Sequence, residues 1–167
     1  WCEATRRAAV IDPGGDIPEI LNFIELLDLE PELALVTHGH FDHCGGAAQF
    51  AALTGARIEG PHRGDAALLR NLGQQPAFHA APLTAPEVAV RSGEGEVPPP
   101  ASGVRSFTPD RWLEHGERVR FGREELEVLH CPGHTHGHLA YFHAGRRQAF
   151  VGDILFRHTI GAWDHPH

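Results

Sequence analysis

Apolar runs and a helical pattern alternate along the first part of the chain. Residues 6–12 and 33–36 are short apolar runs bounded by turn residues, and this pattern predicts two strands. Between them, apolar positions recur at helical spacing across residues 17–29, which predicts an amphipathic helix with Asp16 as its N-cap. A strand, a helix and a second strand form the βαβ unit of a layered α/β fold.

The same patterns continue to residue 72 and resume after residue 106. Helices are predicted over residues 46–53 and 63–72, with a short strand at 57–59 between them. Further strands are predicted in the last part of the chain, over residues 119–121, 126–130, 139–143 and 148–151. The first two of these strands flank Gly122 and are expected to form a hairpin.

Residues 73–106 break this pattern. The segment has few large apolar residues and carries prolines at 98–100, so we interpret it as a long loop with a Gly/Pro-rich insertion at about 84–106. Loops of this length often act as lids over a site, and a neutral insertion fits the pattern equally well. The whole chain, residues 1–167, is expected to be a single domain.

Composition and charge narrow the classes of protein. A hydrophobic content of 41% is ordinary for a soluble globular domain, and no apolar run is long enough to span a membrane. The formal net charge of −8 argues against nucleic acid or an anionic membrane surface as a partner. Cys2, Cys44 and Cys131 are too scattered for a disulfide framework, which favours a reducing, cytoplasmic location.

Both ends of the chain look cut. The sequence contains no Met and begins at Trp1, with no signal-peptide pattern, and it closes on Asp164-His165-Pro166-His167 without a terminating element. We therefore expect a fragment of a longer domain, truncated at both ends.

One segment carries most of the candidate chemistry. Residues 37–43 read Thr-His-Gly-His-Phe-Asp-His and follow the strand predicted at 33–36. In an extended segment alternate residues point the same way, so His38, His40 and Asp42 can converge while His43 faces a neighbouring point. Imidazoles and carboxylates are ligands of zinc, iron and manganese. A solvated loop is the alternative in a chain with 14 His, but this spacing directly after a buried strand favours a metal site.

Histidine and aspartate residues also follow two later predicted strands. Residues 131–138 read Cys-Pro-Gly-His-Thr-His-Gly-His and follow the strand predicted at 126–130. Gly152-Asp153 follows the strand predicted at 148–151. Open α/β sheets bind ligands at the carboxyl ends of their strands, so these positions extend the candidate site.

The succession of these motifs resembles the metallo-β-lactamase superfamily. The order is a strand, H-x-H-x-D-H, then P-G-H-T-x-G-H, then an apolar strand ending in G-D. Within the superfamily the chain looks most like the glyoxalase II-like (hydroxyacylglutathione hydrolase-like) enzymes, including small bacterial members without a separate helical domain. The resemblance implies an αββα four-layer sandwich of two mixed sheets, here incomplete, with the first strand and the C-terminal part missing.

The resemblance also implies a two-metal centre. Its ligands would be His38, His40 and His134 for the first metal, Asp42 and His43 for the second, and Asp153 bridging both. The expected cofactor is Zn²⁺, two per complete site, with iron or manganese as alternatives. The family's last histidine ligand has no counterpart, because His165 and His167 follow Asp153 too closely to match it. His136 and His138 are expected to serve orientation and packing, and Cys44 and Cys131 to be packing residues.

The activity that the resemblance implies is hydrolysis of a small-molecule thiolester. S-lactoylglutathione would give glutathione and D-lactate, with a hydroxide held between the metals as the nucleophile and Asp42 as the residue that holds or receives its proton. An all-His/Asp ligand set with Asp153, where lactam-cleaving members carry a Cys, resembles a thiolester hydrolase. The oligomeric state is not indicated.

Two alternatives remain open. The same signature serves a persulfide dioxygenase, in which His38, His134 and Asp153 would hold a single iron. The other alternative is a truncated domain that binds metal with little activity. Ala162 stands where family members carry a basic residue that helps to hold glutathione, so the metal chemistry is better supported than the thiol carrier.

Overall fold

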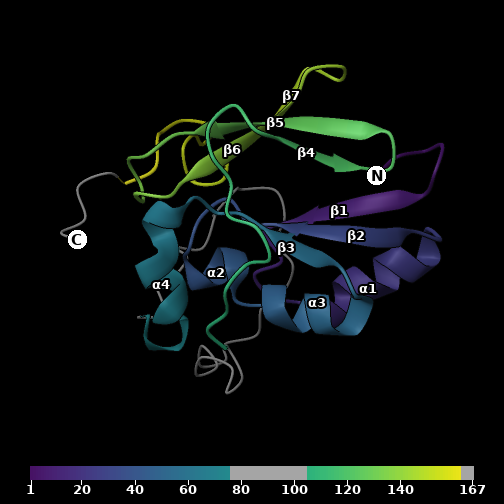
Figure 1. Cartoon of the computed structure of the whole chain (residues 1–167), viewed down its shortest axis with the longest axis horizontal. Coiled ribbons are helices and arrows are strands. Elements are labelled where there is room, and N and C mark those ends of the chain that lie inside the picture. Colours follow the sequence, from purple (N-terminus) through teal and green to yellow (C-terminus); the bar gives the residue numbers. More distant parts are fainter. Residues whose placement is uncertain (76–104, 163–167) are drawn as a thin grey trace.

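Two β-sheets lie one over the other in the molecule (Figure 1). The computed structural model describes residues 1–75 and 105–162. One sheet is parallel, in the order β1-β2-β3, with strands β1 (Arg7–Ile11), β2 (Glu30–Leu35) and β3 (Arg57–Glu59). The other is antiparallel, in the order β4-β5-β6-β7, with strands β4 (Arg118–Phe121), β5 (Glu124–His130), β6 (Leu139–His143) and β7 (Gln148–Phe150).

The helices cover the parallel sheet on the side away from the antiparallel sheet (Figure 1). They are α1 (Ile17–Leu26), α2 (Phe41–Cys44), α3 (Ala47–Thr54) and α4 (Ala66–Arg70), with short 3₁₀ turns η1 (Arg63–Asp65) and η2 (Leu72–Gln74). The described residues therefore build three layers of the predicted sandwich: helices, parallel sheet and antiparallel sheet. None of the helices in this part of the chain is long and apolar enough to cross a membrane.

The second half of strand β2 is buried on both faces and separates two hydrophobic cores. Leu33 and Leu35 pack between the two sheets, against residues of β4, β5 and β6. Ala34 and the following Val36 pack on the other side, against the helices. Side chains of a strand point alternately to opposite faces, so a continuous apolar run suits a strand covered on both sides. The carboxyl end of β2, where the histidine segment begins, is thus held from both faces.

Tyr141 ties the two sheets together near that end of β2. Its side chain is fully buried in β6, and its hydroxyl donates a hydrogen bond to the carbonyl oxygen of Val36 at 2.7 Å. Val36 immediately precedes the histidine segment, so this contact fixes the starting point of the candidate site relative to the second sheet.

The predicted fold class is confirmed, with local differences. The described strands give one all-parallel and one all-antiparallel sheet, so the prediction of mixed sheets is wrong for this part of the chain. Helix α1 ends at Leu26 rather than 29, because Asp28 turns into the left-handed region with φ of 50°. Asp16 does precede α1, but its side chain makes no capping hydrogen bond. The helix predicted at 63–72 is divided into η1 and α4.

The insertion predicted at about 84–106 lies almost entirely outside the described residues. His165 and His167 lie outside them as well, so their exclusion as ligands stays a prediction. The single-domain assignment of residues 1–167 also stays a prediction.

Candidate metal centre

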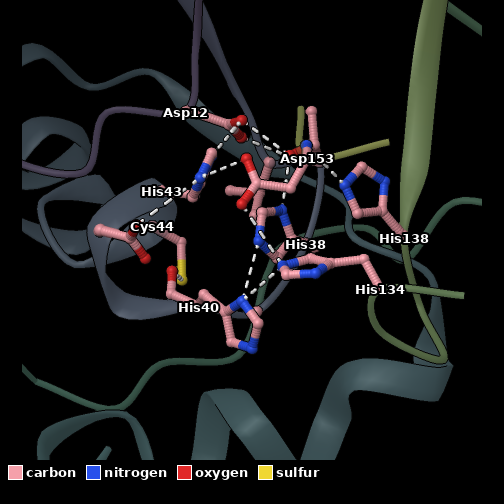
Figure 2. Close-up of polar contacts among 12 residues, drawn as sticks. Asp12, His38, His40, His43, Cys44, His134, His138 and Asp153 are labelled. Carbon is pink, nitrogen blue, oxygen red and sulfur yellow. Dashed lines mark hydrogen bonds and ion pairs between the residues drawn. The ribbon is translucent and has the colours of Figure 1, made fainter. Parts of the chain in front are cut away.

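Four strand ends meet at one edge of the stacked sheets. The parallel strands β1 and β2 lead into Asp12 and into the segment 37–43, and the loops after β5 and β7 carry His134 and Asp153. Figure 2 shows these side chains turned toward one another. The structure therefore brings together histidines and carboxylates from separate parts of the sequence, as predicted from their positions at strand ends.

Three imidazole nitrogens converge at the centre of this cluster. Nδ1 of His40 lies 3.1 Å from Nε2 of His38 and 3.0 Å from Nε2 of His134. The donor atoms of all three residues lie within 4.8 Å of one another. Ligand nitrogens on a tetrahedral zinc, with bonds of about 2.0–2.1 Å, are about 3.3 Å apart. The spacing of these nitrogens fits a metal ion.

Outer hydrogen bonds fix the tautomers of two of these histidines. The Thr37 hydroxyl donates to Oδ2 of Asp12 at 2.7 Å and so accepts from Nδ1 of His38 at 3.0 Å. Nδ1 of His134 donates to the carbonyl oxygen of Ala162 at 2.8 Å. In both rings the proton sits on Nδ1, which leaves the Nε2 lone pair directed into the cluster. Histidines that bind metals are oriented in this way.

Asp153 lies between the three-histidine group and His43. Its Oδ2 is 3.4 Å from Nε2 of His134, and its Oδ1 is 3.1 Å from Nε2 of His43. Oδ2 of Asp42 is 3.8 Å from the same His43 nitrogen. A carboxylate that reaches two neighbouring nitrogen groups has the arrangement expected of a bridging ligand.

Asp42 does not converge with His38 and His40, so that part of the alternation argument is wrong. The chain stops being extended at His40, because Phe41–Cys44 forms the helical turn α2. The turn directs Asp42 beside His43, and the Asp42 side chain remains 44% exposed. The resemblance, which grouped Asp42 with His43, describes this geometry better than the strand periodicity does.

Asp12 is a functional candidate that the sequence analysis did not name. Its carboxylate accepts hydrogen bonds from the Thr37 backbone N–H at 2.7 Å and from the Thr37 hydroxyl, and it is 2.9 Å from Nδ1 of His43. Donor atoms of Asp12, His38 and His43 also lie within 4.8 Å of one another. Since both Asp12 oxygens already accept hydrogen bonds, we interpret Asp12 as a residue that orients ligands. Its position at the end of β1 was the signal available in the sequence.

Burial and neighbouring charges set the protonation of the cluster. Burial lowers the pKa of His38 far below its usual range and also lowers the pKa of His40, helped by the adjacent His134. At His43 burial opposes the charge, but hydrogen bonds to Asp12 and Asp153 raise its pKa to about 10. Burial works in the other direction on Asp153, yet the hydrogen bond from His43 keeps the pKa of its carboxyl lowered. Without metal, His43 is a cation between two carboxylates.

His138 and the nearby cysteines have supporting positions. The buried His138 ring stacks on His38 at 4.5 Å between ring centroids, and its Nε2 accepts the backbone N–H of Asp153 at 3.1 Å. Burial, with the neighbouring His134, lowers the pKa of His138 to about 4, so the ring is neutral.

Cys44 is buried against the His40 carbonyl and Cys131 is half-buried, and burial raises the pKa of both thiols. The His136 side chain is exposed.

Comparisons with known proteins agree with this architecture. The family model described as "Metallo-beta-lactamase superfamily" matches residues 3–167. The chain is 36% identical to "Hydroxyacylglutathione hydrolase GloC" of Haemophilus influenzae over 162 residues, which cover 96% of this chain and 67% of that protein. It is 32% identical to "Hydroxyacylglutathione hydrolase" of Aeromonas hydrophila over 153 residues, covering 91% and 44%.

A solved structure matches as well. The protein TTHA1623, crystallised in a di-iron-bound form, superposes with a TM-score of 0.70 at 31% sequence identity, covering 93% of this chain and 66% of that one. The chain thus spans about two thirds of TTHA1623 and of the Haemophilus relative, and less than half of the Aeromonas relative.

Proposed function

This chain belongs to the metallo-β-lactamase superfamily, and we propose that it hydrolyses thiolesters of glutathione, such as S-lactoylglutathione, in a metal-dependent reaction. The superfamily and the hydroxyacylglutathione hydrolase relatives indicate a hydrolase. The observation that carries the proposal is the convergence of His38 Nε2, His40 Nδ1 and His134 Nε2 beside Asp153.

The proposed ligands divide into two neighbouring groups. His38, His40 and His134 would hold the first metal, His43 and Asp42 would contribute to the second, and Asp153 would reach both. Zinc is the metal that we propose, because three neutral imidazoles are a usual zinc ligand set. The di-iron form of TTHA1623 makes iron the first alternative to test.

The chain's own residues supply orientation and proton acceptance. A metal pair held by these residues would supply Lewis acidity and lower the pKa of a water, which provides a nucleophile near neutral pH. Asp42 is half exposed and its Oδ2 lies 3.8 Å from His43 Nε2, a position beside the proposed second metal from which it can accept a proton. A thiolate leaving group is weakly basic and needs little protonation, so the reaction requires no separate general acid.

A persulfide dioxygenase is the second candidate, since His38, His134 and Asp153 form a two-histidine, one-carboxylate set. His40 belongs to the signature that both activities share, so its position does not separate them. The hydrolase is preferred because the hydroxyacylglutathione hydrolases match this chain at 36% and 32% identity. Oxygen consumption with a persulfide substrate by the iron-loaded chain would favour the dioxygenase.

The direct test is thiolester hydrolysis by the purified 167-residue chain loaded with zinc. We expect loss of the S-lactoylglutathione thiolester absorbance that stops on chelation and returns when zinc is restored. An S-acyl glutathione with a different acyl group tests whether the acyl part matters, and an acyl-cysteamine tests whether the glutathione part does. A folded, zinc-loaded chain that hydrolyses none of these thiolesters would refute the proposal.

We also propose a cytoplasmic location. Cys2, Cys44 and Cys131 are all free thiols, and unpaired cysteines suit a reducing compartment. Fractionation of the producing cell with an antibody to the chain would test this.

A further inference from the structure

Asp65 is a buried carboxylate next to the metal centre that plays no part in the ligand set described above. Asp65 is 1% exposed and is the last residue of η1. The carboxylate accepts three hydrogen bonds, from the Gly39 N–H at 2.8 Å, the Thr135 hydroxyl at 2.7 Å and the Gly137 N–H at 2.6 Å. All three donors are neutral groups, and each bond to a buried carboxylate stabilises its charge.

The three donors come from the two loops that carry the three-histidine group. Gly39 lies between His38 and His40, while Thr135 follows His134 directly. One oxygen atom, Oδ2 of Asp65, accepts from both Gly39 and Thr135. The loops are far apart in the sequence and reach the centre from different sheets, so a shared acceptor fixes the distance between them.

The backbones approach Asp65 so closely that side chains are excluded. A Cβ added to Gly39 would lie 2.8 Å from Cβ of Leu68, and a Cβ added to Gly137 would lie 2.5 Å from the Asp65 nitrogen. Either contact would push a loop away from the carboxylate. The glycines therefore make possible the short hydrogen bonds that join the loops.

Gln75 holds the same segment from the other side. Its Nε2 donates to the Gly39 carbonyl at 2.8 Å, and its Oε1 accepts from the Phe41 N–H at 3.0 Å. The N–H of Gly39 is bound to Asp65 and its carbonyl to Gln75, so the peptide groups between the two histidines are fixed at both ends.

We propose that Asp65 is a positioning residue that sets the spacing between His134 and the His38–His40 pair and thereby the metal affinity of the three-histidine group. This inference rests on the proposed metal centre and makes its role more specific. A carboxylate is suited to the task because it is an acceptor only, with room for several donors, whereas an amide would turn an N–H toward one of the three donors. Asp65 acts on the metal through the loops and does not contact it.

The test is the zinc affinity of Asp65→Asn, measured by competition with a chromophoric chelator. We expect the variant to keep the far-UV circular dichroism spectrum of a folded chain and to bind zinc about 10–100-fold more weakly, as is usual when an outer partner of a metal ligand is lost. Unchanged zinc affinity in a folded Asp65→Asn variant would overturn the inference.

Asp110→Asn is the matched control. Oδ2 of Asp110 accepts the Ile58 N–H at 2.8 Å, so the same substitution again takes a carboxylate oxygen away from a backbone donor. That donor lies in β3 and belongs to neither histidine loop. We expect Asp110→Asn to lower the melting temperature and leave zinc affinity unchanged. An equal loss of affinity in both variants would mean that general destabilisation is the cause, and would also overturn the inference.

A pair of substitutions at Thr135 decides the matter if Asp65→Asn does not fold. Thr135→Val removes only the hydroxyl bond to Asp65, while Thr135→Ser retains it. We expect weaker zinc binding in Thr135→Val and wild-type binding in Thr135→Ser; equal affinities in the two variants would refute the positioning role. Absence of zinc binding by the wild-type chain would instead refute the proposed metal centre, so the two failures are distinguishable.

Discussion

Oδ2 of Asp12 lies 2.9 Å from Nδ1 of His43, so a carboxylate at the end of β1 orients an imidazole of α2. The same carboxylate accepts the Thr37 hydroxyl, which in turn accepts from Nδ1 of His38. One side chain outside the expected ligand set therefore aligns histidines of both proposed metal positions. Such outer partners contribute to metal affinity as well as to stability.

The first prediction concerns Asp12→Asn. The substitution replaces one carboxylate oxygen by an NH₂ group, which would face groups that donate hydrogen bonds to Asp12 in the wild type. We therefore expect the free energy of unfolding to fall by about 1–3 kcal/mol. We also expect zinc affinity to fall by about 10–100-fold. Denaturant unfolding of the metal-free chain and chelator competition measure the two effects.

Asp28→Asn is the control for this substitution. Asp28 has the same φ of 50° as Asp12, but it is exposed and lies after α1, away from the histidines. We expect little change in either quantity. A loss of zinc affinity in Asp28→Asn equal to that in Asp12→Asn would contradict the orienting role.

The second prediction concerns Asp153→Asn. Asp153 is the group that reaches both His134 and His43, so its loss should disrupt the proposed two-metal arrangement more than the three-histidine group. We expect thiolester hydrolysis to fall by about 100-fold or more, with one zinc still bound per chain. Initial rates and elemental analysis of the same sample check this. Wild-type rates in the variant would exclude a bridging role.

The third prediction concerns the contact between the sheets. Tyr141→Phe removes the hydroxyl that donates to the Val36 carbonyl in a fully buried position. We expect the free energy of unfolding to decrease by about 1–3 kcal/mol, because a buried acceptor loses its partner. Urea unfolding measures the difference. A variant as stable as the wild type would show that this bond does not hold the end of β2.

The fourth prediction concerns pH and the antiparallel sheet. Hydrogen bonds from His143, at 2.6 Å, and from Arg146, at 3.1 Å, hold the pKa of the Glu124 carboxyl below its usual 4.5. A carboxyl with a lowered folded pKa stabilises the protein above its unfolded pKa, and this contribution is lost as pH falls through the folded value.

Glu124→Gln tests this dependence. The melting temperature of the wild type should exceed that of the variant at neutral pH, and the difference should shrink on acidification below about 4.5. A difference that stays constant across this range would mean that the charge of Glu124 does not contribute.

Strand ends made much of the site predictable. His38, His134 and Asp153 follow apolar strands, and parallel strands or stacked sheets bring such ends together. The alternation rule failed at Asp42, because hydrogen bonds such as Cys44 N–H to the His40 carbonyl begin a helical turn. A short turn of this kind has no clear signal in a run of four residues.

Asp65 could not be found in the same way. Its donors lie 26, 70 and 72 residues away in the sequence, and only the folded chain brings them together. Asp12 could have been identified from the sequence, since it lies at the end of a predicted strand as Asp153 does. The position of a carboxylate at a strand end is therefore informative, whereas the role of a carboxylate within a predicted helix depends on the tertiary structure.

Metal content per folded chain tests the central claim most directly. Elemental analysis of the wild-type chain, purified without chelator, would be compared with a His38→Ala, His134→Ala double variant whose folding is checked by circular dichroism. The account predicts at least one tightly bound metal ion per wild-type chain and its loss in the double variant. A folded wild-type chain that contains no metal and does not bind added zinc or iron would contradict it.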